Sequence, residues 1–181
     1  NLTAVTPVND TSTNKRVRTI NCYTISDTNP LTFYPLNRYG QNEVTNNNLT
    51  FGEDISSGIT GTDNTIFGVD TGSSLTSGNR NTLYGSYAGN LNVEGDDNTF
   101  IGYNSGLENV SGSNCTVIGA SAMDDSGDFA NHNNTFIGKD CGGGTWTTTA
   151  STGNVAIGSG AMNLALNDAD NNTIIGYGAN P

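Results

Sequence analysis

The chain has 181 residues, of which 33 % are hydrophobic and 13 % are charged. This composition excludes a thick conventional core and also a charge-driven disordered chain. Six Lys and Arg against 17 Asp and Glu give a net charge of −11. Nucleic acids and anionic membranes attract clustered basic residues, so neither is predicted as a partner. No apolar run approaches the roughly 18 residues of a membrane-spanning helix, so no membrane insertion is predicted.

The N-terminal segment, residues 1–44, differs from the remainder of the chain. Residues 1–40 carry four basic and two acidic side chains, whereas residues 41–181 carry two basic and 15 acidic ones. Residues 18–26 alternate polar and apolar side chains with the period of a β-strand. A segment of this kind can cap the open edge of a repeat fold or anchor it to another protein. We therefore predict an N-terminal arm or cap followed by a second domain, residues 45–181.

Residues 45–181 contain eight copies of a five-residue block, of which Asn98-Thr-Phe-Ile-Gly102 is typical. Asn fills the first position in seven copies, and Cys115 fills it in the other. The asparagines are Asn48, Asn64, Asn81, Asn98, Asn134, Asn154 and Asn172. The closing glycines, which lie 16 to 20 residues apart, are Gly52, Gly68, Gly85, Gly102, Gly119, Gly138, Gly158 and Gly176.

Each block is typical of a short strand that ends at its Gly, because β-branched and aromatic residues fill it and polar turn residues bound it. Two adjacent positions are apolar, as in Ile174-Ile175, so both faces of the strand require burial. Stacking the copies as a parallel β-solenoid of about eight coils buries one face. The apolar residues on the other face also require burial, which predicts contact with another layer. A second chain is the simplest candidate for that layer.

Two columns of the repeat support this all-β fold. Stacked Asn side chains, about 4.8 Å apart from coil to coil, form hydrogen-bonded amide ladders along the axis. Gly supplies a turn without the steric cost of a Cβ atom. A small residue stands three positions after the Gly in seven copies, as at Ala88 and Cys141. Eight coils at this spacing predict a rod of roughly 38 Å.

The blocks resemble the head repeats of trimeric autotransporter adhesins, and still more the related repeats of phage and giant-virus fibre proteins. Asn154-Val-Ala-Ile-Gly158 is closest to the adhesin form, although the intervals here are longer than the adhesin repeat of 14 residues. The resemblance covers residues 48–181. It implies a left-handed parallel β-roll assembled as a homotrimer, with a structural or adhesive role on a surface. The chain shows no coiled-coil stalk or membrane anchor, which favours a fibre or spike attached through its N-terminal arm.

Residues with catalytic chemistry are few, and we predict no enzyme, metal site or cofactor. The single histidine, His132, lies in an Asn-rich loop. The acidic clusters at residues 94–97 and 124–128 lie in turns, where solvated carboxylates are expected. Trp146 lies in the longest loop between blocks, where an exposed indole could stack on a glycan or anchor a partner. The alternative for Trp146 is that it covers the edge of a coil or a subunit seam.

The resulting hypothesis is a non-enzymatic fibre or spike protein on the surface of a virus or phage particle. Its expected partners are further copies of itself, a capsid, tail or other virion protein bound through the arm, and a host-surface glycan or receptor. The first alternative is the head of a trimeric adhesin on a bacterial cell surface. The second is a small fibre-borne glycan depolymerase, which would need paired carboxylates as acid and base.

Overall fold

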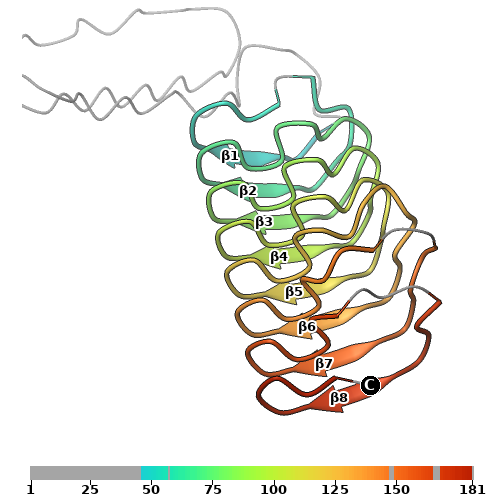
Figure 1. The fold of residues 1–181 in the computed structure, drawn as a ribbon. Helices are drawn as coiled ribbons and strands as arrows, with labels where there is room; N and C mark the ends of the chain where they lie inside the picture. Colours follow the sequence, from blue (N-terminus) through green and yellow to red (C-terminus); the bar gives the residue numbers. More distant parts are fainter. Residues whose placement is uncertain (1–45, 57, 147–148, 165–167, 181) are drawn as a thin grey trace, which may run out of the picture. The chain divides into compact units, whose positions relative to one another are not determined.

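The computed structural model of the chain describes residues 46–56, 58–146, 149–164 and 168–180. It contains eight strands of three residues each, stacked in chain order (Figure 1). They are β1 (Leu49–Phe51), β2 (Thr65–Phe67), β3 (Thr82–Tyr84), β4 (Thr99–Ile101), β5 (Thr116–Ile118), β6 (Thr135–Ile137), β7 (Val155–Ile157) and β8 (Thr173–Ile175). Every strand lies inside a repeat block and ends at the residue before its Gly, as the sequence predicts.

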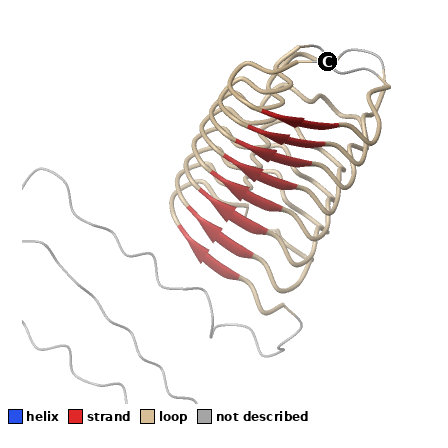
Figure 2. Ribbon diagram, turned by 90° about the horizontal axis from the view of Figure 1, so that it is seen from below, coloured by secondary structure: helices blue, strands red, loops and turns tan. Residues whose placement is uncertain are grey.

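The strands form one parallel sheet in which equivalent positions of successive repeats are paired. Phe100 is aligned with Val117, and Val117 with Phe136. Figure 2 shows the strands running in the same direction along one side of the coils. The predicted all-β parallel solenoid is therefore confirmed. The eight strands make about seven turns, because the described part of the last repeat ends soon after β8.

No helix is found among the described residues, and consequently none there is long and apolar enough to cross a membrane. The predicted arm, residues 1–44, lies outside the residues that the structure describes, as does residue 45 of the predicted second domain.

The interior contains one central residue of each strand, the small-residue column and further buried residues of the loops, among them Leu75, Met123, Trp146 and Met162. Ile66, Leu83, Phe100, Val117 and Phe136 are almost completely buried at the centres of β2 to β6. The small residues after the turn are buried against them, and they are Thr71, Ala88, Ser105, Ala122, Cys141 and Ala161. Only a small side chain fits here because the coil doubles back directly onto the strand. The core is therefore narrow, in agreement with the low hydrophobic content.

The glycine that ends each block is required by contact between coils as well as by its turn. These eight glycines have φ angles between +130° and +155°, where side chains with a Cβ atom are strained. A Cβ atom on Gly119 would lie 2.4 Å from the carbonyl oxygen of Gly138 in the next coil. The same conflict recurs at Gly85, Gly102, Gly138 and Gly158. The glycine column thus sets how closely the coils approach.

We expect Gly119→Ala to lower the free energy of unfolding by about 2 kcal/mol or more, because it combines backbone strain with a clash between coils. Gly58→Ala is the matched control, since a Cβ atom there would meet no atom within 4 Å. Denaturant unfolding followed by circular dichroism measures both. Equal stabilities of the two variants would contradict the proposed role of the glycine column.

Candidate functional site: the asparagine column and the outward strand face

The asparagine column forms the predicted ladder along the axis. The backbone N–H of Asn81 donates to Oδ1 of Asn64 at 2.9 Å, and that of Asn98 donates to Oδ1 of Asn81 at 2.9 Å. Equivalent bonds of 2.8 to 3.0 Å join Asn64 to Asn48, Asn154 to Asn134 and Asn172 to Asn154. Asn64, Asn81, Asn98, Asn134 and Asn154 are fully buried. These amides therefore satisfy backbone groups that have no access to water.

A second column, which sequence analysis missed, completes this network. The side-chain Nδ2 of every ladder asparagine except the last, Asn172, donates to a carbonyl oxygen three residues before the next ladder position, as from Asn81 to Gly95 at 2.8 Å. The accepting residues are Gly61, Gly78, Gly95, Gly112, Ser151 and Ala169. In the one block without asparagine, the Cys115 thiol donates instead to the Asn131 carbonyl. The signal available in the sequence was the recurrence of Gly at this position in four successive coils.

Asn81→Leu removes three side-chain hydrogen bonds, two that Asn81 Nδ2 donates to Asn64 and Gly95 and one that Asn81 Oδ1 accepts from the Asn98 N–H. The buried N–H of Asn98 is then left without its acceptor. We expect a loss of about 3 kcal/mol or more of unfolding free energy, since each unsatisfied buried polar group costs about 1–3 kcal/mol. Asn172→Leu, the same change in the half-buried last coil, should cost clearly less. Urea unfolding of both variants provides the comparison, and similar losses would contradict the dependence on burial.

The strand residues on either side of each buried centre point away from the interior and form what we call the outward strand face. It consists of the first and third residues of all eight strands. Thr dominates the first position, and Phe, Tyr or Ile fills the third. Phe67 is 41 % exposed, Tyr84 53 % and Ile157 38 %. The two adjacent apolar positions therefore separate as predicted, with one buried in the coil and one presented outside it.

The outward strand face carries no charged residue, and its third-position column is apolar in all eight strands. At its N-terminal end the rings of Phe51, Phe67 and Tyr84 are stacked, with centroids 4.8 and 4.9 Å apart and planes within 12° of parallel. From β4 onward the third position is always Ile. A continuous exposed apolar strip of this kind marks an interaction surface in a soluble protein.

Trp146 is buried, although the sequence predicts an exposed position in a loop. It is 2 % exposed and packs edge-on against Phe136, with ring centroids 6.0 Å apart. In the single chain, Trp146 therefore does not present its indole to solvent, as a contact with a glycan or partner would require. Its ring packs in the interior beside β6. The alternative, that Trp146 covers part of a coil, agrees with this position.

The loop residues with catalytic chemistry have structural roles in the described coils. Nδ1 of His132 accepts a hydrogen bond from the backbone N–H of Ser113 at 3.0 Å. Asp96 accepts from the backbone N–H of Asn79 at 2.7 Å, and Asp97 forms a bidentate ion pair with Arg80. These contacts join consecutive coils. No cluster of three or more His, Cys, Asp or Glu side chains suited to a metal ion is found in the part of the chain described.

The two described cysteines are buried free thiols. Burial raises the pKa of Cys115 and of Cys141 to about 11, so both remain protonated at neutral pH. Reactive cysteines require the thiolate and access to solvent. Cys115 and Cys141 therefore occupy repeat columns as structural residues.

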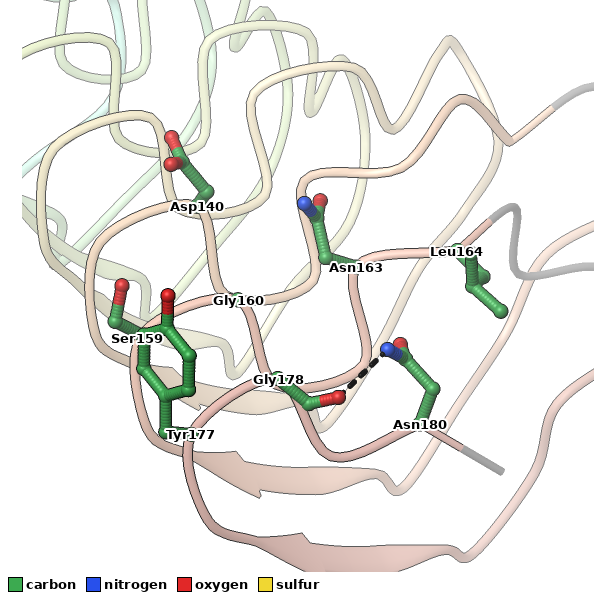
Figure 3. Close-up of a pocket in the computed structure, with 8 residues that line it drawn as sticks. All are labelled: Asp140, Ser159, Gly160, Asn163, Leu164, Tyr177, Gly178 and Asn180. Atoms are coloured by element: carbon green, nitrogen blue, oxygen red, sulfur yellow. Dashed lines mark hydrogen bonds between the residues drawn. The ribbon is translucent and has the colours of Figure 1, made fainter.

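A shallow groove of about 350 Å³ lies beside the last three strands (Figure 3). Asp140, Asn163, Tyr177 and Asn180 contribute most of its polar groups, and Tyr177 is 90 % exposed. Asp140 is the one acid among its eight lining residues. The groove therefore lacks the pair of carboxylates that glycoside hydrolysis uses.

No sequence family, no curated protein and no solved structure matches the chain.

The environment of the Glu108 carboxyl group predicts a dependence of stability on pH that can be tested. Partial burial raises its pKa, and the nearby Asp125 carboxylate raises it further. The folded state thus holds the Glu108 proton more strongly than the unfolded state, so this group lowers stability as the pH rises through its pKa. Glu108→Gln should therefore be more stable than the parent at neutral pH, with the difference vanishing at low pH.

Thermal unfolding across a pH series measures this effect, and Glu94→Gln is the control because it removes the same charge from an exposed loop. A stability gain in Glu94→Gln equal to that in Glu108→Gln would assign the effect to net charge instead.

Proposed function

We propose that this chain is a non-enzymatic structural protein of a fibre or spike, assembled as a homotrimer through the outward strand face. The observation that carries the proposal is the continuous apolar strip on the outer side of all eight strands. Parallel sheets occur almost only with both faces covered, and one face of this sheet is covered within the chain. The other exposes an apolar side chain at each strand from β2 to β4 and again at β7 and β8.

A second copy of the chain matches this strip better than an unrelated partner. Both copies present their outward columns at the same spacing from coil to coil, so an aligned pair repeats each contact along the axis. Residues 41–181 carry a net charge of −13, which opposes close contact through the acidic loops. The outward strand face carries no charge, so two copies can meet there without repulsion between like charges.

The aromatic end of the strip also favours packing between chains over glycan binding. The rings of Phe51, Phe67 and Tyr84 cover one another's faces. A sugar stacks on the open face of an aromatic ring, whereas a neighbouring chain can pack against ring edges. We therefore assign host attachment to residues outside this strip.

The left-handed coil, the trimeric state and the particle of a virus or phage rest on the resemblance of the repeats. Attachment to a capsid or tail protein is assigned to the basic arm, residues 1–44, because its charge complements an acidic partner. The same repeats also suit the head of a bacterial trimeric adhesin. A signal peptide upstream of these repeats, with a coiled coil and a membrane barrel downstream of them in the same full gene, would establish that alternative.

The test is the mass of the protein in solution. Light scattering should give about three times 18.8 kDa for the unaltered chain. The double variant Ile101→Lys and Ile157→Lys places two charges in the strip, at positions that are 36 % and 38 % exposed in the single chain. We expect it to remain folded and to dissociate into monomers, because burying an unpaired ammonium group is strongly unfavourable.

The matched control is Ser77→Lys with Ala130→Lys, which adds the same charge at two exposed loop positions. The control should keep the mass of the unaltered chain. A folded monomer for the unaltered chain, or equal dissociation of both double variants, would reject assembly through the outward strand face.

A further inference from the structure

A mostly polar column of residues runs through the buried interior beside the asparagine ladder, with which it shares Gly95 and Gly112 as hydrogen-bond partners. Leu75, Asn92, Asn109, Ser126 and Trp146 come from five successive coils, and all five are buried. Backbone bonds align the first three coils, since Thr76 N–H donates to the Val93 carbonyl and Val93 N–H to the Val110 carbonyl. The N–H of Trp146 donates to the carbonyl of Asp125, the neighbour of Ser126. We call these five residues the interior polar column.

Four of the five residues carry a buried polar atom with no hydrogen-bond partner among the described residues. The atoms are Nδ2 of Asn92, Oδ1 of Asn109, Oγ of Ser126 and Nε1 of Trp146. Leaving such an atom unpaired in a protein interior costs about 1–3 kcal/mol. Four unpaired atoms in one column of a narrow core therefore require an explanation.

Each of the two amides is held by a hydrogen bond from its other polar atom. Oδ1 of Asn92 accepts from the Gly95 N–H at 2.9 Å, and Nδ2 of Asn109 donates to the Gly112 carbonyl at 2.9 Å. In the asparagine ladder, by contrast, neighbouring amides bond directly, as from Asn81 to Asn64 at 3.1 Å. No such direct bond joins Asn92 to Asn109.

We propose that the interior polar column binds ordered water between the third and sixth coils. Asn92 Nδ2 and Trp146 Nε1 are hydrogen-bond donors, Asn109 Oδ1 is an acceptor, and the Ser126 hydroxyl can be either. A buried water typically takes two to four such partners. We infer the room for water from Ser126, whose side chain is much shorter than those of Leu75, Asn92 and Asn109 in the same column. Leu75 and Trp146 are the first and last residues of the column, and both are buried.

Bound water would give these buried polar side chains the hydrogen-bond partners that the protein itself does not supply. Polar residues can then occupy the narrow core without the cost of unpaired polar atoms. Each bridging water satisfies groups on two coils and so acts as a hydrogen-bonded link along the axis. The inference concerns a single chain and is independent of the proposed trimer.

The experiment compares two buried serines with the same exposure and different partners. Ser126 Oγ belongs to the interior polar column, whereas Ser105 Oγ already bonds the Gly102 carbonyl at 3.1 Å. The variants are Ser126→Ala and Ser105→Ala in the full chain. Oxygen-17 relaxation dispersion of the solvent counts long-lived internal waters, and a high-resolution crystal structure locates them.

We expect the unaltered chain to show long-lived waters at the interior polar column, Ser126→Ala to lose at least one, and Ser105→Ala to keep all of them. The fluorescence maximum of Trp146, the only Trp in the chain, should shift in Ser126→Ala alone. A crystal structure with direct Asn92–Asn109 bonds and no water in the column would overturn the proposal. An unchanged water count in Ser126→Ala would do the same.

Discussion

The hydrogen bonding of each coil to the next is the constraint on which the rest of this structure depends. A strand of three residues forms too few bonds to be stable alone, so each coil must bond its neighbour at every backbone group that lacks access to water. The asparagine column provides acceptors for buried N–H groups, as Asn81 does for Asn98. The glycine column allows the approach that these bonds require, as the contact of Gly119 with Gly138 illustrates.

The same constraint leads to a thin core and an unusual distribution of polarity. A coil of about 17 residues encloses few apolar side chains, and several of its buried residues are polar, so apolar burial inside one chain is limited. Asn64 and Asn81 are as deeply buried as Ile66 and Leu83. Stability therefore rests on satisfied amides to an extent that is rare in globular domains, and a change in one coil affects both neighbours.

The proposed assembly follows from what the coil leaves uncovered. An apolar side chain at the third position of each strand cannot enter the interior, because adjacent strand residues point to opposite sides. The rings of Phe67 and Tyr84 reduce their contact with water by stacking on one another. The Ile residues at the third position from β4 onward have no ring and cannot stack in this way. A neighbouring chain along this strip would complete the burial that a single chain lacks.

The sequence by itself determined the parallel solenoid, its strand positions and its asparagine ladder, because a one-dimensional repeat places equivalent residues in contact whatever the exact shape of the coil. It did not determine the path of the irregular loops, which decided that Trp146 packs on Phe136 instead of facing solvent. It also did not reveal the carbonyl acceptors such as Gly95, or why Asp63, Asn114 and Asn133 precede a ladder position. These three residues have φ angles near +60°, which Asn and Asp tolerate better than other side chains. Such requirements arise from the three-dimensional closure of each coil, and so only the tertiary structure decided them.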